Sequence, residues 1–199
     1  FSRLHGATPT AIRKGESTLK TFAPLKMKIV LEGGYLLDYK IVKKEAFDII
    51  GMSRILPYDA TGSDINEFWQ EMISTDYGSR HFSNYGVSLD FQGEFGNHKY
   101  KYLVAQLYDA DKDYPDEMEV YTIPDLDWVV FPCVGPEPET LMRVVEQVYS
   151  EWLPTLREYD IDGRYLIEYY DDPGKYANDV RDEKYYVELW FPIRKKSEK

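Results

Sequence analysis

The feature of this 199-residue sequence that most constrains its fold is an order of secondary structure that occurs twice. Two segments carry apolar residues at the i, i+3, i+4, i+7 spacing of an amphipathic helix, one from Ile65 to Ile73 and one from Leu141 to Trp152. Two strand-like segments precede each predicted helix, and two more follow it. This internal β-β-α-β-β repeat predicts an α+β fold. We expect the halves to form one continuous antiparallel sheet with both helices packed on it.

The predicted strands are short runs of apolar, aromatic and β-branched residues. In the first half they span residues 36–43, 47–56, 87–91 and 100–108, and in the second half 118–123, 128–134, 165–170 and 185–193. Ser63 or Asp64 is able to cap the first helix. The second helix is expected to begin at Pro138, to carry Glu139 in its first turn and to end at Pro154.

The first fifteen residues differ in character from the rest. Residues 1–5 are typical of a last helical turn that stops at Gly6, and Thr8 caps a short basic helix with Pro9 at its first position. The pattern Phe-x-Arg…Gly-x-Thr-Pro-x-x-x-Arg resembles the close of the second helix-turn-helix in AraC-type transcription regulators. The resemblance implies that residues 1–15 are the remnant of a DNA-binding module, that residues 16–34 are a linker, and that the chain is the C-terminal part of a longer regulator.

Charge supports this division of the chain. Residues 1–28 hold 6 of the 24 basic residues and 1 of the 35 acidic residues, which leaves 18 basic against 34 acidic residues and a net charge of −16 for the remainder. Such a body is repelled by phosphate backbones. Any contact with DNA is therefore expected from sequence upstream of this chain.

Residues 35 to about 195 are similar to the GyrI-like effector-binding domain, which follows AraC-type DNA-binding modules and occurs in multidrug-sensing regulators. The domain assigned by this resemblance spans residues 35–199. In that family a concave sheet holds a small molecule in its groove, often an aromatic or lipophilic cation. The motifs that carry the resemblance include Tyr39-Lys-Ile-Val, Phe47-Asp-Ile-Ile-Gly51, Tyr121-Thr-Ile-Pro124, Trp152-Leu-Pro154, Ile167-Glu-Tyr169 and Leu189-Trp-Phe-Pro-Ile193.

Glu168 is the residue that points most directly to a site. It lies inside a strand otherwise built for burial, and alternation places Leu166, Glu168 and Tyr170 on one face of that strand. A buried carboxylate is costly unless it is paired, hydrogen-bonded or faces a solvated cavity, and within an aromatic cavity it attracts cations. Glu168 also matches the position of the acid that reads the ligand in the resembling family. The alternative is a solvent-facing acid or an ion-pair partner, because Glu188 is similarly placed.

Aromatic residues are expected to line the cavity around Glu168. The 18 tyrosines and 4 tryptophans exceed what a core of this size needs. Trp190 and Tyr170 are expected on the strand face near the acid, whereas a tryptophan at helical spacing is more often a core residue. The predicted ligand-binding residues are Glu168, Tyr170, Trp190, Tyr102, Tyr39, Trp128 and Trp69, with Phe68 as an alternative to Trp69.

These features favour a sensor domain of an AraC-type regulator that binds a small hydrophobic or cationic aromatic ligand in the sheet groove and is not an enzyme. The alternatives are a hydrolase of strained rings, with Glu168 beside Tyr170 or Tyr102, and an acidic protein-binding module of the gyrase-inhibitor type. The three histidines are scattered and no CxxC or HExxH motif is present, so neither a metal nor another cofactor is expected. The single Cys133 and the absence of a long apolar run favour a cytoplasmic protein. The sequence allows a homodimer.

Overall fold

The computed structural model describes Thr10, residues 13–15, residues 37–89 and residues 98–196. The chain divides into two compact units, Phe1–Tyr35 and Leu36–Lys199. The predicted helix-turn-helix remnant and linker lie outside the described residues, except for Thr10 and residues 13–15. There, the Lys14 amide donates a hydrogen bond to the Thr10 carbonyl at 3.1 Å. The fold described below is that of the second unit.

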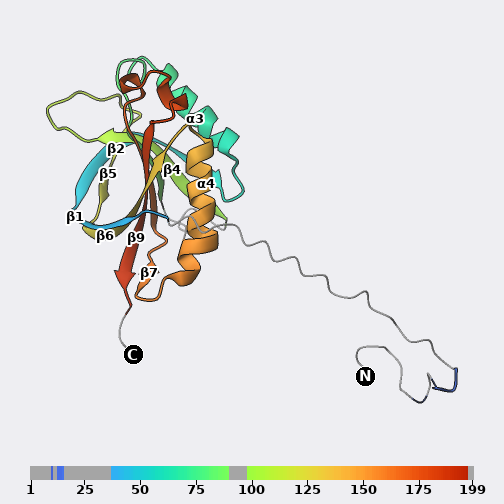
Figure 1. Cartoon of the computed structure of the whole chain (residues 1–199). Helices are drawn as coiled ribbons and strands as arrows, with labels where there is room; N and C mark the ends of the chain where they lie inside the picture. Colours follow the sequence, from blue (N-terminus) through green and yellow to red (C-terminus); the bar gives the residue numbers. More distant parts are fainter. Residues whose placement is uncertain (1–9, 11–12, 16–36, 90–97, 197–199) are drawn as a thin grey trace. The chain divides into compact units, whose positions relative to one another are not determined.

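The described strands of this unit form one antiparallel sheet (Figure 1). Along the sheet the order is β1-β6-β9-β8-β3-β4-β2-β5, and β7 pairs with β9. The eight predicted strands are confirmed, seven of them with shifted ends, whereas the three-residue β7 was missed because it is too short to show alternation. The strands are β1 (Lys40–Lys44), β2 (Phe47–Pro57), β3 (Tyr85–Leu89), β4 (Lys99–Leu107), β5 (Glu119–Ile123), β6 (Leu126–Val134), β7 (Tyr159–Ile161), β8 (Tyr165–Tyr170) and β9 (Tyr186–Lys195).

The strand order has an approximate twofold symmetry whose centre lies between β3 and β8. When β1, β2, β3 and β4 are exchanged with β5, β6, β8 and β9 respectively, the strand order reads the same from the opposite edge of the sheet. The first strand of each half pairs with a strand of the other half, since β1 pairs with β6 and β5 pairs with β2. At the centre, Gly86 pairs with Glu168 and Ser88 pairs with Leu166. The symmetry thus places Glu168 beside the junction of the two halves.

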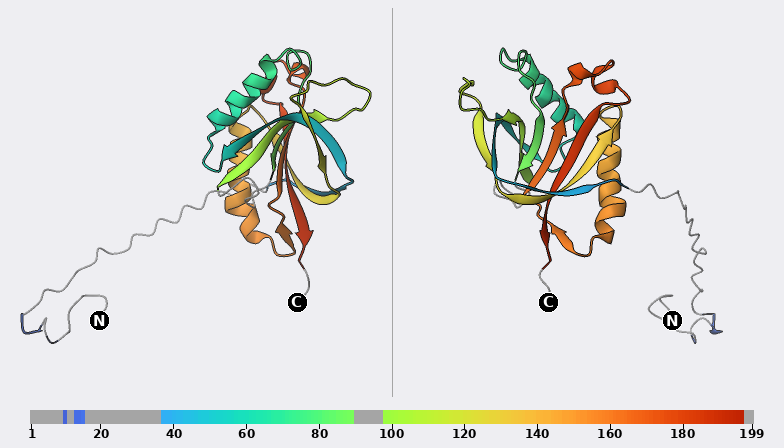
Figure 2. Two further views of the ribbon diagram at one scale, coloured as in Figure 1. Left: turned by 180° about the vertical axis from the view of Figure 1, so that it is seen from behind. Right: turned by 60° about the vertical axis from the view of Figure 1, so that its left-hand side comes forward.

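Both helices, α3 (Gly62–Ser74) and α4 (Glu139–Gln147), cover the same face of the sheet (Figures 1 and 2). Phe68 and Met72 of α3 pack on the first half, and Leu141 and Val144 of α4 pack on the second half. After α4 the chain continues through one π-helical turn, Val148–Trp152, and a 3-10 turn, Leu153–Thr155. The helical path therefore reaches Pro154, as the sequence predicted.

The capping prediction for α3 was wrong. Thr61 is the N-cap: its side chain accepts from the Asp64 amide at 3.4 Å, and Asp64 Oδ2 accepts from the Thr61 amide at 2.6 Å. This reciprocal pair is a capping box, in which Asp64 is the third helical residue and not the cap. Ser63 and Asp64 both lie inside the helix, so the prediction began the helix two or three residues too late.

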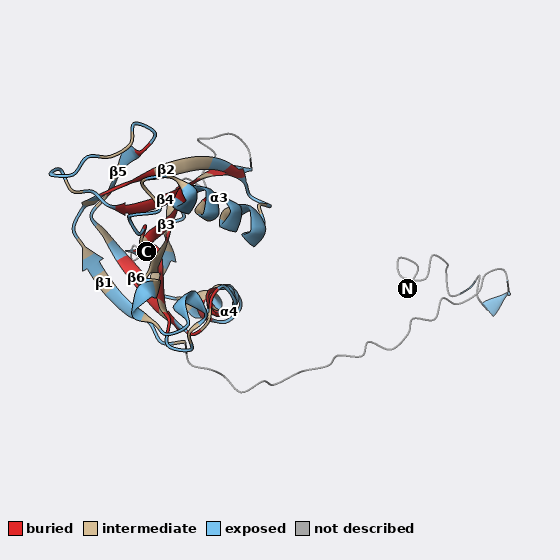
Figure 3. Ribbon diagram, turned by 90° about the horizontal axis from the view of Figure 1, so that it is seen from above, coloured by how far each residue is buried: buried red, intermediate tan, exposed pale blue. Residues whose placement is uncertain are grey.

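The other face of the sheet is covered by the sheet itself. One apolar cluster there draws residues from β5 and from β6, which lie near opposite ends of the strand order, so the sheet curls over this face (Figure 3). Trp128 and Trp190 are buried in this cluster with their ring centroids 6.0 Å apart. The inner side of the curl is therefore filled with side chains, and the helix-covered face is the one that holds Glu168.

Candidate functional site

Four side chains on the helix-covered face form a hydrogen-bonded chain, which we call the Glu168 cluster. The hydroxyls of Tyr102 and Tyr170 donate to the same Glu168 oxygen, Oε2, at 3.0 and 2.9 Å. The indole N–H of Trp69 donates to the Tyr102 hydroxyl at 3.0 Å. Three elements thus meet here, since Glu168 and Tyr170 come from β8, Tyr102 from β4 and Trp69 from α3.

Gly86 makes the approach of Tyr102 to Glu168 sterically possible. It pairs with Glu168 across β3 and β8. A Cβ atom at position 86 would lie 2.3 Å from the Tyr102 hydroxyl oxygen and 2.7 Å from Glu168 Oε2. Sequence reasoning missed this role, although a glycine inside a strand is a known signal of close approach by another group.

The Glu168 carboxylate accepts hydrogen bonds from neutral donors, but no basic residue in the described ranges 37–89 and 98–196 forms an ion pair with it. Burial raises the pKa of Glu168 above its ordinary value, and the hydrogen bonds from Tyr170 and Tyr102 oppose that rise. Burial, and then the negative charge of Glu168, hold the pKa values of Tyr102 and Tyr170 well above the ordinary range. The two hydroxyls therefore remain protonated donors near neutral pH.

Trp69 connects the Glu168 cluster to a pocket of about 390 Å³. Its ring meets the ring of Tyr170 edge-on, with centroids 5.2 Å apart. Phe82, Ser83 and Pro173 line other parts of this pocket. The Ser83 hydroxyl is buried and has no hydrogen-bond partner among the described residues. Glu168, which is partly buried, is not among the residues that line this pocket.

Glu188 lies on the opposite face of the sheet and is an internal ion-pair partner. Its carboxylate accepts from Lys40 Nζ at 2.8 Å, from the Tyr186 hydroxyl at 2.7 Å and from the Trp190 indole at 2.8 Å. Burial alone would raise the pKa of Glu188, but these three donors together lower it. Within the described part of the chain, Glu188 thus has an internal cation and Glu168 does not.

The structure brings together four of the seven predicted site residues: Glu168, Tyr170, Tyr102 and Trp69. Placing Trp190 near the acid was wrong, because Trp190 pairs with Ile167 and shares its face. Trp128 is buried with Trp190 in the apolar cluster on the face of the sheet opposite Glu168.

Tyr39 is also remote from the cluster. It is 50% exposed, and its ring lies 5.9 Å from Phe131 and 5.5 Å from Trp152. Phe68 is a buried core residue whose ring meets that of Tyr102 at 6.5 Å.

A further buried carboxyl group, Glu137, was not predicted. One of its oxygens accepts from the Leu141 amide at 3.3 Å, and the other has no partner among the described residues. Burial raises the pKa of Glu137 to about 7, and the negative charge of Glu168 adds to the rise. The sequence signal was an acid between two prolines directly before a helix.

Two kinds of site are absent from the described part of the chain. It contains no group of three or more His, Cys, Asp or Glu side chains that could hold a metal ion. Among its helices, none has the length and apolar character that a membrane span requires.

Several solved structures share this fold at low sequence identity. SAV2435, solved bound to tetraphenylphosphonium, has a TM-score of 0.58 and 18% identity over 79% of this chain and 94% of its own. The integron cassette protein VCH_CASS2 of Vibrio cholerae has a TM-score of 0.58 and 12% identity over 78% and 95%. A Staphylococcus aureus MU50 protein assigned to transcription regulation has a TM-score of 0.56 and 17% identity over 79% and 99%.

No curated protein matches the sequence. A family model, by contrast, covers most of the chain. The model of Cass2, described as an integron-associated effector binding protein, matches residues 40–193. The chain therefore belongs to the Cass2 family of effector-binding proteins.

Proposed function

We propose that this chain senses a small aromatic cation, which binds against Glu168. The observation that carries the proposal is a partly buried carboxylate that has two tyrosine donors and no internal cation among the described residues. A ligand cation would supply the missing charge. The faces of Tyr102, Tyr170 and Trp69 would surround its apolar groups.

Electrostatics and family membership both support a cation. A carboxylate and aromatic ring faces attract the same positive charge, and partial removal of water strengthens both attractions. The family is one of effector-binding proteins. SAV2435, which shares the fold, was solved with tetraphenylphosphonium, a cation that carries four aromatic rings.

Entry of such a ligand would require Trp69 to move. Its ring packs on Tyr170 and also forms one wall of the pocket of about 390 Å³. A ligand in that pocket would reach the carboxylate once the indole had turned away from Tyr102. The cost is about one hydrogen bond and one ring contact, roughly 1–3 kcal/mol in total.

The regulatory part of the proposal rests on the N-terminal resemblance. We propose that an AraC-type module upstream of residue 15 contacts DNA and that residues 16–34 pass the signal to it. Coupling of this kind requires that the ligand bind two states of the domain with different affinity. A cytoplasmic location and a homodimer are compatible with this role.

Thermal denaturation with tetraphenylphosphonium tests the binding site. Binding raises the melting temperature with dose, because the ligand stabilises only the folded state. We expect Glu168→Gln to weaken binding about tenfold or more, since it removes the charge and keeps the shape. Glu67→Gln, an exposed change on α3, should bind like the wild type. Neutral triphenylphosphine oxide should give a much smaller shift. Equal shifts for the wild type and Glu168→Gln would refute the proposed site.

A hydrolase is the second candidate, because a carboxylate within 3.0 Å of two phenols is also an acid–base pair. Incubation of the chain with an aromatic epoxide such as styrene oxide, with product formation as the readout, tests for this hydrolase activity. Turnover that is lost in Glu168→Gln would favour the enzyme over the sensor. We expect no turnover above the background rate.

A further inference from the structure

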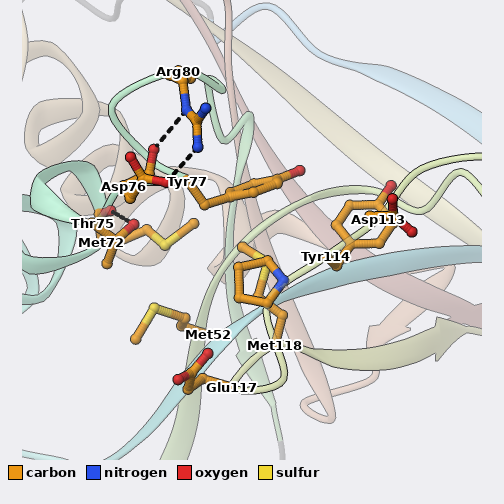
Figure 4. Close-up of a pocket in the computed structure, with 11 residues that line it drawn as sticks. Met52, Met72, Thr75, Asp76, Tyr77, Arg80, Asp113, Tyr114, Glu117 and Met118 are labelled. Atoms are coloured by element: carbon orange, nitrogen blue, oxygen red, sulfur yellow. Dashed lines mark hydrogen bonds and ion pairs between the residues drawn. The ribbon is translucent and has the colours of Figure 1, made fainter.

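A second, larger pocket lies at the C-terminal end of α3 (Figure 4). Its volume is about 540 Å³, within the range of pockets that hold drug-sized ligands. Three parts of the chain build it: the middle of β2 on the face that α3 covers, the end of α3 with the turn that follows, and the loop between β4 and β5. None of the residues of the Glu168 cluster lines it.

The apolar surface of this pocket consists mainly of methionine and tyrosine. Met52, Met72 and Met118 line it together with Tyr77 and Tyr114, and Figure 4 shows these side chains around one space. The two tyrosine rings lie 5.9 Å apart and are tilted by 46°. Methionine side chains are flexible and polarizable, so they adapt to apolar ligands of different shape and make favourable contacts with aromatic rings.

The tyrosine rings are fixed by hydrogen bonds at their hydroxyl ends. The Tyr77 hydroxyl accepts from Gln106 Nε2 at 2.6 Å, and the Tyr114 hydroxyl accepts from the Asp109 amide at 3.0 Å. Tyr77 is held further by the ring of His81, which stacks on it at 4.2 Å. The pocket thus combines rigid aromatic walls with an adaptable methionine lining.

The charged groups of the pocket are mostly acidic. Asp76, Asp113 and Glu117 contribute carboxylates, and Arg80 is the one basic residue among the lining residues. The Arg80 guanidinium is already paired with Asp76, because it donates to both the side-chain carboxylate and the backbone carbonyl oxygen of Asp76. No described residue forms an ion pair with Asp113 or Glu117. A ligand in this pocket would therefore meet two carboxylates whose charge is not neutralised.

We propose that this methionine pocket is a second ligand site, which takes an amphipathic amine with an apolar or aromatic body and one ammonium group. The body would lie against the methionines and the tyrosine rings, and the ammonium group would lie beside one of the two unpaired carboxylates, Asp113 or Glu117. The two pockets share Met72 and Arg80, whereas Met52 and Met118 line only this one. Occupancy of the second site can therefore be observed separately.

Methyl NMR of the full chain with ¹³C-labelled methionine tests the site. The chain has five methionines, which single Met→Leu variants assign. With 4-phenylbutylammonium as the probe, we expect the methyl signals of Met52 and Met118 to shift with dose. Met142, which is 64% exposed on α4, serves as the internal control and should not shift. Shifts of equal size at Met142, or no shift at Met52 and Met118, would overturn the proposal.

Two variants separate the pocket from the Glu168 cluster. Asp113→Asn combined with Glu117→Gln should weaken binding of the amine roughly fivefold, because exposed carboxylates contribute modest screened attraction. Glu168→Gln should leave the Met52 and Met118 shifts unchanged. Unaltered affinity in the double variant would exclude the ammonium subsite, and loss of both shifts in Glu168→Gln would exclude an independent site. Neutral 4-phenylbutanol should bind as weakly to the wild type as the amine binds to the double variant.

Discussion

At the scale of single residues, the two strand acids differ in how their charge is balanced. Glu188 has an ammonium group and two neutral donors, whereas Glu168 has two tyrosine hydroxyls alone among its described partners. Removing a buried charge's partner is costly, and supplying one is correspondingly favourable. This difference, more than exposure, distinguishes a proposed ligand residue from a structural one.

Substitution of Gly86 tests how tightly the Glu168 cluster is packed. A Cβ atom there meets the fully buried Tyr102 side chain, so we expect Gly86→Ala to lower the free energy of unfolding by about 1–3 kcal/mol. Urea denaturation measures the change. Gly163→Ala is the matched control, because a Cβ atom at that position has no neighbour within 4 Å. Equal stability of the two variants would show that the cluster is loosely packed.

Glu137 predicts a pH dependence of stability. Its pKa is about 7 in the folded chain against an ordinary value of 4.5, so between these values the folded state holds a proton that the unfolded state has released. Stability should therefore fall as the pH rises from about 4.5 to 7, by up to about 3 kcal/mol.

Denaturant unfolding across this pH range checks the effect of Glu137. Glu137→Gln cannot titrate, so its stability profile should be flatter than that of the wild type. The exposed change Glu146→Gln should leave the wild-type slope in place. An identical slope in the wild type and Glu137→Gln would assign the dependence to other groups.

At the scale of elements, α3 is the part that brings Trp69 to the Glu168 cluster. Its first turn is fixed by the capping box between Thr61 and Asp64. We expect Thr61→Ala to cost about 1 kcal/mol, because the Asp64 amide loses its acceptor. Thermal denaturation measures this loss, with Ser63→Ala as the control. A larger loss of stability in Ser63→Ala than in Thr61→Ala would show instead that Ser63 is the cap, as the sequence analysis predicted.

The elements and the faces within each strand could be predicted from the sequence, but the pairing between strands could not. Alternation along one strand correctly placed Glu168 and Tyr170 together, since that relation depends only on the period of two. Trp190 lies on another strand, and a shift of one residue in register moves a side chain to the other face. Nothing in the local pattern determines that Trp190 pairs with Ile167. For the same reason, the sequence could not predict that side chains fill the inner side of the curled sheet.

At the scale of the whole effector-binding unit, the two halves depend on each other. β1 pairs with β6 of the second half, β5 pairs with β2 of the first, and β3 pairs with β8 at the centre. Glu168 and Tyr170 come from the second half, whereas Tyr102 and Trp69 come from the first. The proposed ligand site therefore exists only when both halves are folded together.

Expression of the separate halves tests this dependence. Residues 36–113 and 114–199 each contain strands whose partners lie in the other fragment. We expect each fragment alone to lack the far-ultraviolet circular dichroism of the intact chain and an equimolar mixture to recover part of it. A fragment that folds cooperatively by itself would contradict this view.

The most direct test of the proposed ligand site is a crystal structure of the chain with tetraphenylphosphonium. We predict that the phosphonium lies beside the Glu168 carboxylate, with its phenyl rings against Tyr102 and Tyr170 and with the Trp69 ring displaced from Tyr170. A cation that occupies only the methionine pocket, or a Glu168 cluster that remains closed at saturating cation, would contradict the assignment of Glu168 as the residue that reads the ligand.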